Sequence, residues 1–346
     1  MAFRWIEKGR PAVVLAPMEG VTDAPMRLLM GERGGFSYAV SEFLRVNQEV
    51  PPAHVFLTHI PELAAGARTS SGLAVQVQLL GGSGEVLGES AARAVYLGAR
   101  AIDLNFGCPA ATVNRHDGGA TLLKYPSRLR SIVEAVRKAV PAHIPVSAKL
   151  RLGFDCMDSI HENAERAAEG GASWITIHGR TKIQGYMPPA YWGPIGEVNR
   201  RLSIPVVANG DIWTLEDLRR CREETHCEHF MLGRGAMANP NLPRAVAVEL
   251  GISPFTAEES RPFARDLSDW GPLIERFVDV SRPFAKHSNH SLNRIKQWAR
   301  MAHLRGPLPW FEVLKLYRDL GEALALFRLA SGLNLRQEAI TYAIQE

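Results

Sequence analysis

The sequence predicts an α/β protein, a (β/α)8 TIM barrel followed by a small all-helical domain. Short apolar, β-rich runs recur through roughly the first 250 residues, and most of them precede a segment with helical periodicity. A polar residue follows almost every apolar run. A doubly wound open sheet is the alternative, but no Gly-x-Gly-x-x-Gly follows the first run, which disfavours a dinucleotide-binding sheet.

Eight apolar runs are predicted to form the barrel strands. Parallel barrel strands are covered on both faces, so their sequences are nearly continuously apolar instead of alternating. The runs are Val13–Ala16, Tyr38–Ser41, Ala74–Leu79, Ala101–Leu104, Pro145–Leu150, Trp174–Ile177, Pro205–Ala208 and Phe230–Leu232.

Helical periodicity between these runs predicts the outer layer of the barrel. It is clearest at Glu85–Leu97, Arg128–Val140, Ser159–Glu169 and Leu215–Arg222. Gly98 and Pro141 follow the first two segments, where such residues commonly end helices. Thr214 is the expected N-cap of the last segment, because Glu216 and Asp217 lie in its first turn.

The pattern changes after the last predicted strand. Ser253–Asp266 is rich in Pro, Glu, Ser and Arg and is interpreted as a linker. Helical periodicity then occurs at Leu273–Val280, Leu292–Leu304, Phe311–Phe327 and in the C-terminal stretch, with no convincing strand. We therefore expect a barrel domain at residues 1–250 and a helical domain at residues 255–346.

Composition indicates a cytoplasmic protein. Hydrophobic residues make up 46% and charged residues 22% of the chain, as in soluble globular proteins. No apolar run approaches the roughly 20 residues of a membrane span, and the N-terminus carries charges where a signal peptide has an apolar core. The cysteines lack Cys-x-x-Cys spacing, so we expect no metal site and no disulfide framework. A monomer is the default expectation.

Basic residues are concentrated in the predicted helical domain. The segment 282–305 contains six Lys or Arg residues and no acidic residue, although the net charge of the chain is only +4. Such asymmetry favours a polyanionic partner, with an ordinary solvated helix face as the alternative. Ile295 and Trp298 are expected to face the core, whereas Asn293, Lys296 and Arg300 lie near one face.

Function in such barrels collects on the loops after the strands. Cys108 follows one strand within Asn105-Phe-Gly-Cys-Pro, where Gly107 and Pro109 constrain its turn. This makes Cys108 a candidate for chemistry, with a small buried residue at a strand end as the alternative. Other polar or charged residues at strand ends are Glu19, Glu42, Arg45, Lys149, Arg151, His178 and Arg180.

Two further strand ends predict a phosphate site. Asn209-Gly210-Asp211 and Gly233-Arg234-Gly235 follow the last two strands, where barrels commonly bind phosphate through backbone N–H groups near helix starts. A ligand bound there must also reach Gln78, Lys149 and His178 across the mouth. FMN, which is phosphorylated and planar with hydrogen-bonding edges, is the natural candidate.

Specific motifs cover most of the chain and resemble the tRNA-dihydrouridine synthase family. They are Leu15-Ala16-Pro17-Met18-Glu19-Gly20-Val21, Gln78-Leu79, Asp103-Leu104-Asn105-Phe106-Gly107-Cys108-Pro109, Gly118-Gly119-Ala120-Thr121-Leu122-Leu123, Lys149-Leu150-Arg151-Leu152-Gly153, Ile177-His178-Gly179-Arg180-Thr181, Asn209-Gly210-Asp211 and Gly233-Arg234-Gly235. Other segments resemble the members that modify uridine 16 of the D-loop. These are Glu42-Phe43-Leu44-Arg45-Val46, Pro52 to Leu63, Thr112-Val113-Asn114 and Arg294-Ile295-Lys296-Gln297-Trp298.

The resemblance implies a flavin-dependent reduction of uridine to 5,6-dihydrouridine in tRNA, at position 16. FMN would be the bound cofactor and NADPH its reductant. Residues implied to surround the flavin are Pro17, Met18, Glu19, Gln78, Lys149, His178, Asn209, Gly210, Asp211, Gly233 and Arg234. Residues implied to contact the target nucleotide or the tRNA are Arg45, Asn105, Tyr186, Asn293, Arg294, Lys296 and Arg300.

Cys108 is implied to be the general acid that protonates C5 of the uracil, opposite the face that receives hydride at C6. A thiol suits this role because its reference pKa of about 8.5 keeps it mostly protonated at neutral pH. Ala111 departs from the family pattern, since many relatives have a lysine just after Cys-Pro. That departure concerns a phosphate contact near the site and leaves the chemistry unaffected.

Three other functions remain as alternatives. A flavin barrel could act on a free pyrimidine or a small enone, although the basic helix disfavours this. A non-catalytic RNA-binding barrel is disfavoured by the full set of Cys108, Lys149, His178 and Asn209-Gly210-Asp211. A phosphosugar aldolase with Lys149 as its Schiff base would explain the phosphate site but leaves Cys108 and the helical domain unexplained.

Overall fold

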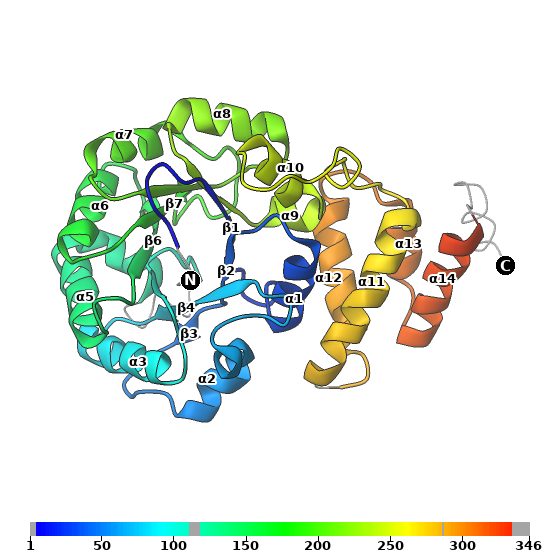
Figure 1. Ribbon diagram of the computed structural model, residues 1–346, viewed down its shortest axis with the longest axis horizontal. Helices are drawn as coiled ribbons and strands as arrows, with labels where there is room; N and C mark the ends of the chain where they lie inside the picture. The colour runs from blue at the N-terminus through cyan, green and yellow to red at the C-terminus, as the bar shows by residue number, and fades with distance from the viewer. Residues whose placement is uncertain (1–4, 111–117, 286, 334–346) are drawn as a thin grey trace.

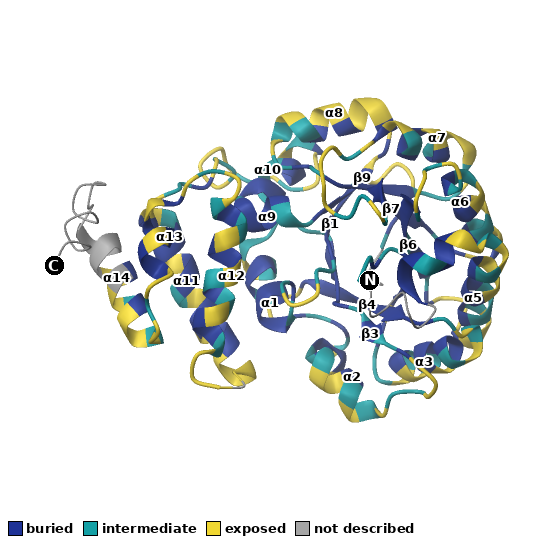
Figure 2. Ribbon diagram, turned by 180° about the vertical axis from the view of Figure 1, so that it is seen from behind, coloured by how far each residue is buried: buried dark blue, intermediate teal, exposed yellow. Residues whose placement is uncertain are grey.

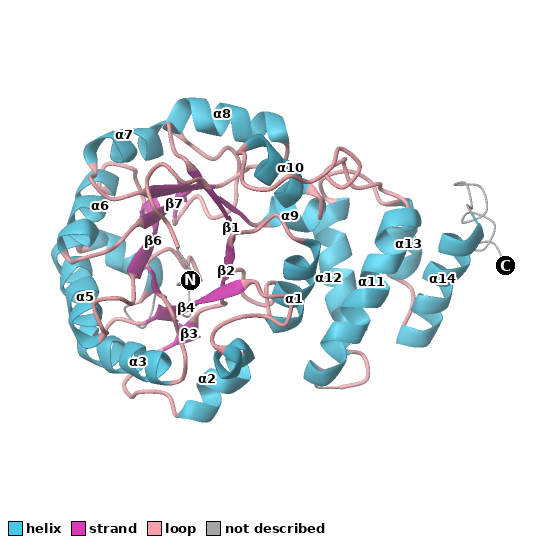
Figure 3. Cartoon of the chain, in the orientation of Figure 1, coloured by secondary structure: helices cyan, strands magenta, loops and turns pink. Residues whose placement is uncertain are grey.

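The computed structural model describes residues 5–110, 118–285 and 287–333 and shows a closed parallel barrel surrounded by helices (Figure 1; Figure 3). Its strands are β1 (Ala12–Leu15), β2 (Tyr38–Val40), β3 (Leu44–Arg45), β4 (Ala74–Leu80), β5 (Ile102–Asn105), β6 (Val146–Gly153), β7 (Ile175–Thr181), β8 (Val206–Asn209) and β9 (His229–Leu232). The two-residue β3 lies beside the end of β4, and the other eight strands close because β2 pairs with both β1 and β4. The predicted TIM barrel is confirmed.

The register of the strands brings polar residues to one level near the mouth. Asn105 of β5 pairs with Lys149 of β6, and His178 of β7 pairs with both Arg151 of β6 and Asn209 of β8. The carboxyl ends of all these strands lie at the same end of the barrel because the pairings are parallel.

Helices form the outer layer, with buried residues toward the strands and exposed residues outward (Figure 2). They are α1 (Ala24–Arg33), α2 (Ala53–His59), α3 (Gly84–Tyr96), α5 (Pro126–Ala139), α6 (Ile160–Glu169), α7 (Gly193–Arg201), α8 (Leu215–Thr225), α9 (Arg234–Ala238) and α10 (Leu242–Glu249), with 3-10 turns at Pro61–Ala65 and Gly119–Lys124. The expected N-cap at Thr214 is confirmed. Its hydroxyl accepts the N–H of Asp217, whose carboxylate accepts the N–H of Thr214, so the two residues form a capping box.

The helices after the barrel are α11 (Leu267–Ser281), α12 (His290–His303), α13 (Pro309–Leu314) and α14 (Leu320–Leu333), with a 3-10 turn at Arg282–Phe284. The all-helical character of this region is confirmed for the part of it that the structure describes. The single helix expected at Phe311–Phe327 is wrong, because the chain turns between α13 and α14. Asp319 Oδ1 accepts the N–H of Glu322 and starts a new helix there. The exact division between domains stays a prediction.

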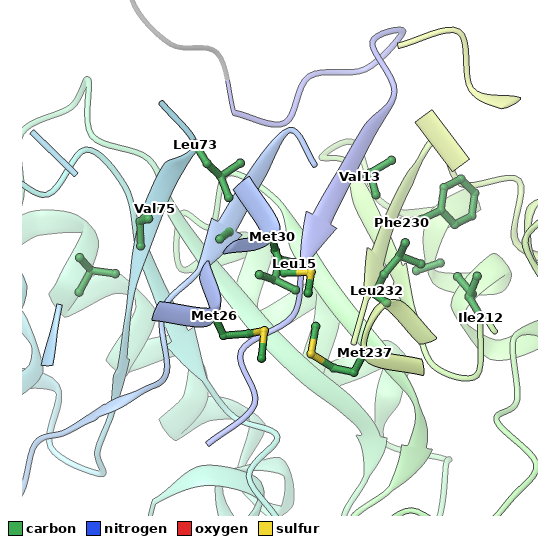
Figure 4. Packing of buried hydrophobic residues seen from close by; sticks show 14 of the residues in the cluster. Val13, Leu15, Met26, Met30, Leu73, Val75, Ile212, Phe230, Leu232 and Met237 are labelled. Carbon is green, nitrogen blue, oxygen red and sulfur yellow. The ribbon is translucent and has the colours of Figure 1, made fainter. Parts of the chain in front are cut away.

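The C-terminal helices pack against the barrel beside α1 and α9 (Figure 1). As predicted, Trp298 of α12 is buried, and its indole N–H donates to the carbonyl of Met237 in α9 at 2.9 Å. On the barrel side, Met26 and Met30 of α1 lie close to Leu15 of β1, with Met237 alongside (Figure 4). This continuous apolar packing fixes α12 next to the barrel mouth.

Candidate active site

A cavity of about 590 Å³ lies at the carboxyl ends of the strands. Its volume is in the range that holds a cofactor or a drug-sized ligand. The predicted site residues that line it are Pro17, Met18, Glu19, Asn105, Cys108, Lys149, His178, Tyr186, Asn209, Gly210, Asp211, Gly233 and Arg234. Residues from loops distant in sequence therefore meet at one mouth, as the sequence indicates.

Cys108 lies on this cavity in a loop that Asn105 organises. The side-chain oxygen of Asn105 accepts the backbone N–H groups of Gly107 and Cys108, both at 2.9 Å. The Cys108 side chain packs with Leu80 and is 9% exposed, and burial raises the pKa of the thiol above its ordinary value. The thiol therefore stays protonated at neutral pH, which is the state a general acid requires.

Lys149 extends from β6 to the cavity. Its Nζ donates to Asn209 Oδ1 at 3.2 Å, and Asn209 Nδ2 donates to the carbonyl of Met231 at 2.8 Å, which fixes the orientation of that amide. Burial, with Arg151 nearby, lowers the pKa of Lys149 to about 8. The amine is still mostly charged at neutral pH and can donate to an anionic or carbonyl group.

His178 on β7 is held in its neutral form. Burial, followed by the positive charges of Arg151 and Lys149, keeps the pKa of His178 well below 6.5. Arg180 Nη1 lies 3.4 Å from His178 Nε2. Because a guanidinium only donates, Nε2 is the acceptor and the imidazole proton is on Nδ1. His178 thus serves as a hydrogen-bonding group and not as a cation.

Asp211 anchors the cationic side of the cavity. Its Oδ2 accepts from Arg180 Nη2 and from the N–H of Ala190, and its Oδ1 accepts from Arg234 Nη2 at 3.2 Å and Trp213 Nε1 at 3.3 Å. The backbone of Asp211 has φ of 51°, a left-handed conformation that Asp tolerates better than most residues. Its carboxylate is therefore engaged in holding two arginines.

Glycines let the backbone on either side of Arg234 pack closely against neighbouring loops. A Cβ at Gly233 would lie 3.2 Å from the sulfur of Met18, and one at Gly235 would lie 2.1 Å from the carbonyl oxygen of Ile212. Both glycines line the cavity at the start of α9. A guanidinium that lines the cavity beside a glycine-flanked turn is a chemical environment that suits a phosphate.

Arg151 connects the Cys108 loop with the loop that carries Tyr186, a role that the sequence did not reveal. Its Nε donates to the carbonyl of Gly107 at 2.7 Å, and its Nη1 donates to the carbonyls of Thr181 at 3.0 Å and Gly185 at 2.8 Å. Its guanidinium carbon lies 5.4 Å from the centre of the Tyr186 ring. Arg151 lies two residues after Lys149 on the same strand, so the two side chains point to the same face of the sheet. This spacing could have indicated that Arg151 lies at the site.

Gln78 is the predicted cofactor residue that does not line the cavity. It is fully buried, its Oε1 accepts from Asn105 Nδ2 at 2.8 Å, and its Nε2 donates to Asp103 at 2.7 Å. A role of Gln78 in cofactor binding stays a prediction. Its observed contacts connect it to the cavity through Asn105.

The residues predicted to contact RNA from α12 differ in their surroundings. Arg294 is only 11% exposed and contacts the barrel, with its Nε 3.1 Å from Asp23 and its Nη2 donating to the carbonyl of Val21 at 2.7 Å. Lys296 Nζ donates to backbone carbonyls near the end of α13. Asn293 and Arg300 are exposed. Arg45, in β3, is partly buried.

Two side chains in and just after α12, Met301 and Arg305, connect this helix to the mouth, and neither was predicted to lie there. Met301 lines the cavity from α12. The guanidinium carbon of Arg305 lies 3.5 Å from the centre of the Trp213 ring, and that of Arg234 lies 5.1 Å from the same ring. Met301 carries no sequence signal, whereas Arg305 belongs to the basic segment 282–305 that favours a polyanionic partner, although its contact with Trp213 could not be predicted. Ala111 and Thr112–Asn114, which the sequence singled out, lie outside the described residues.

The match to a known family decides the family of this chain. The dihydrouridine synthase (Dus) family matches residues 14–308, which include the end of β1, all later strands and the residues that line the cavity. This chain belongs to the dihydrouridine synthase family. The resemblance seen in the motifs is confirmed.

Curated dihydrouridine synthases are similar along nearly their whole length. The tRNA-dihydrouridine(16) synthase of Shewanella oneidensis is 40% identical over 322 residues, 92% of this chain and 98% of that protein. The protein of the same name from Pseudomonas putida is 45% identical over 291 residues, 84% and 87% of the two chains. That of Neisseria meningitidis serogroup B is 41% identical over 294 residues, 85% and 86% of the two chains.

A solved structure supports the barrel alone. Histamine dehydrogenase from Rhizobium sp. 4-9 superposes with a TM-score of 0.54 at 15% identity, covering 78% of this chain and 49% of that chain. Among the residues that the structure describes, no helix combines the length and the apolar character needed to cross a bilayer.

Proposed function

We propose that this dihydrouridine synthase reduces a uridine of tRNA to 5,6-dihydrouridine, and that the target is uridine 16. The support from relatives is that proteins 40–45% identical along most of both chains carry the name tRNA-dihydrouridine(16) synthase. The observation that carries the chemistry is the position of Cys108 on a cavity that also has a cationic, glycine-rich corner. Cys108 follows β5 and Arg234 follows β9, which lie four strands apart in either direction around the barrel.

Family membership implies a flavin, and FMN is the form that we propose. The cavity fits it, because Arg234 and the glycine-flanked start of α9 suit a phosphate, and Lys149, His178 and Asn209 offer hydrogen bonds to a polar ring edge. When bound, the flavin supplies the hydride that adds to C6 of uracil, and NADPH restores its reduced form. The acidic residue Asp211 is already paired with two arginines and does not oppose the phosphate.

The residues of the chain then orient the base and supply a proton. Cys108 keeps its proton at neutral pH because of its burial, so it can deliver that proton to C5 of the uracil. Asn105 and Tyr186 line the same cavity and are proposed to contact the base. Tyr186 is 59% exposed at the rim, where an aromatic ring can stack on an incoming base.

A uridine in folded tRNA is inaccessible until its base leaves the stack, which costs a few kcal/mol. Basic and polar side chains on the rim and on α12 are proposed to hold the RNA backbone and offset that cost. Asn293 and Arg300 are exposed, and they are proposed to contact the RNA. Arg45 is proposed at the rim, while Arg294 and Lys296 would act mainly through the packing of α12. We propose a monomer acting in the cytoplasm.

Reaction of the purified protein with NADPH and tRNA tests the proposal. An unmodified tRNA transcript that contains U16 is incubated with the yellow holoenzyme, and dihydrouridine is located by its block to reverse transcription after borohydride treatment. We expect a stop at position 16 that disappears in a transcript with cytidine at that position. Reduction of free uridine at a similar rate would favour a small-molecule enzyme, and a colourless protein that binds tRNA would favour a non-catalytic role.

A further inference from the structure

A group of buried polar side chains lies inside the barrel next to the cavity. Gln76 and Gln78 of β4, Asp103 of β5 and Ser147 of β6 are each at most 2% exposed. Gln78 is in register with Asp103, and Asp103 is in register with Ser147. Inward residues of neighbouring strands at one level meet in the interior of a barrel. None of the four lines the cavity, so the proposed chemistry does not explain their polarity.

These side chains form one hydrogen-bonded chain that ends at the Cys108 loop. The hydroxyl of Ser147 and the Nε2 of Gln78 both donate to the carboxylate of Asp103. Gln78 Oε1 then accepts from Asn105 Nδ2 at 2.8 Å. Asn105 Oδ1 in turn accepts the two backbone N–H groups at Gly107 and Cys108.

The direction of this chain follows from the charge of Asp103. An ionised carboxylate only accepts, so Gln78 must turn its NH₂ toward Asp103 and its oxygen toward Asn105. Asn105 must then turn its NH₂ toward Gln78, which leaves its oxygen for the loop. The orientation of an amide is otherwise open to a flip of nearly equal shape. Asp103 therefore sets the orientation of Gln78 and, through it, reinforces the orientation of Asn105 that the two backbone N–H groups also favour.

The fixed orientation of Asn105 also determines what it can offer a substrate. Its oxygen already accepts two N–H groups, and one hydrogen of its NH₂ is used on Gln78. The remaining hydrogen is a donor, and Asn105 lines the cavity. A donor matches a carbonyl oxygen of uracil, whereas a flipped amide would present an acceptor and release the Cys108 loop.

Asp103 is an unfavourable residue to bury. Burial raises its pKa to about 6, although hydrogen bonds from Ser147 and Gln78 and the charge of Lys149 oppose the rise. On another side it faces Tyr38 of β2, whose own pKa is raised by burial and then by Asp103. A neutral amide would cost less free energy at this position. The presence of a carboxylate at this costly position indicates that its inability to donate hydrogen bonds has a function.

We infer that Asp103 is a positioning residue, which acts through Gln78 and Asn105 to hold the Cys108 loop and to present an amide donor to the substrate base. The kinetic part of its test rests on the proposed function, because kcat and KM are measured with tRNA and NADPH. Its effect on the loop can be measured without that function.

The test compares Asp103→Asn with Asp158→Asn, the same chemical change at an exposed position. Both holoenzymes are measured at pH 8 for flavin content, thermal midpoint, and kcat and KM with tRNA and NADPH. In Asp103→Asn we expect a higher thermal midpoint and normal flavin content, but a kcat reduced about tenfold or more because the reacting groups are misplaced. Asp158→Asn should match the unsubstituted enzyme in all four quantities.

A readout that does not depend on turnover is the rate at which iodoacetamide alkylates Cys108 in the holoenzyme, followed by mass spectrometry of the Cys108 peptide. Release of the loop in Asp103→Asn should change this rate several-fold. An unchanged alkylation rate, or a kcat within twofold of the unsubstituted enzyme, would overturn the role of Asp103. A fall in kcat together with lower flavin content and a lower midpoint would also overturn it, since a residue needed only for folding behaves in that way. If the unsubstituted enzyme forms no dihydrouridine, the proposed function fails and the alkylation rate alone decides the role of Asp103.

Ser147→Ala provides a second variant that keeps the charge of Asp103. Loss of one donor to the carboxylate should raise the pKa of Asp103 further, while Gln78 still donates to it. The acid limb of tRNA-dependent turnover, expected near pH 6, should therefore move to higher pH in Ser147→Ala and be absent in Asp103→Asn. An acid limb at the same pH in all three proteins would contradict the role of Asp103.

Discussion

Arg294 of α12 is paired with Asp23, the residue whose carboxylate caps the start of α1, with 3.1 Å between Arg294 Nε and Asp23 Oδ2. The same guanidinium donates to the carbonyls of Gly20 and Val21, in the loop after β1. Glu42 accepts the N–H of Gly20 from the other side. Segments that mark the resemblance to uridine-16 enzymes thus meet where the C-terminal helices join the barrel mouth.

Arg294 and Arg300 should therefore respond differently to substitution. Arg294→Gln removes an almost buried ion pair at the junction, so we expect a lower thermal midpoint and a loss of roughly 1–3 kcal/mol in unfolding free energy. Arg300→Gln removes an exposed charge, so we expect unchanged stability and a slope of log Kd for tRNA against log salt that is smaller by about 1. Thermal melts and filter binding over a salt series measure both. The reverse assignment of the two effects would contradict the contacts described for α12.

Cys108→Ala should retain flavin and tRNA binding but lose most turnover, because the proton for C5 then has no donor in place. The expected loss is about 10²- to 10⁴-fold, the usual contribution of general acid catalysis. Since burial raises the pKa of this thiol, turnover of the unsubstituted enzyme should persist to a pH above the ordinary thiol value before it falls. Single-turnover reoxidation of the reduced flavin by tRNA measures these effects. Normal product formation by Cys108→Ala would show that Cys108 is not the general acid.

Asp211→Asn keeps the shape of the side chain but removes the counter-charge of two arginines. Arg180 has no exposed side-chain surface, and an uncompensated buried charge costs about 3–5 kcal/mol. We therefore expect unfolding at a lower urea concentration. We also expect weaker retention of flavin, because Arg234 loses its carboxylate partner as well. Asp158→Asn is the matched control. A variant as stable as this control would show that the carboxylate does not hold Arg180.

Asp103 should affect stability in a pH-dependent manner. Its folded-state pKa of about 6 lies above the ordinary 3.8, so burial favours the protonated form. The stability associated with that proton is fully present below pH 4 and is lost as the pH rises through 6. Asp103→Asn should accordingly gain about 2 kcal/mol relative to the unsubstituted protein between pH 4 and pH 7. Urea unfolding of both proteins across this range measures the difference, and a constant difference would mean that Asp103 titrates normally.

The sequence was sufficient to predict the barrel and most of the residues that line the cavity. Apolar runs mark strands that are buried on both faces, and closure of a parallel barrel brings every strand end to one mouth. Cys108, Lys149 and His178 could therefore be placed together without coordinates.

Contacts between elements could not be predicted in this way. Periodicity places Arg294 and Lys296 on a helix but does not reveal that Asp23 or the end of α13 lies opposite them. Gln78 was assigned to the cavity although a neighbouring strand provides partners for both ends of its amide. The sequence predicted no separate role for Asp103, because a single acidic residue within an apolar run forms no recognisable pattern. Its role depends on its contacts with Ser147 and Gln78 on adjacent strands.

The most direct measurement of the central claim is a map of dihydrouridine in tRNA from a strain that lacks this gene, complemented with either the unsubstituted protein or Cys108→Ala. We expect dihydrouridine at position 16 alone to disappear in the deletion strain, to return with the unsubstituted protein and to stay absent with Cys108→Ala. Full modification at position 16 in the deletion strain, or its restoration by Cys108→Ala, would contradict the account.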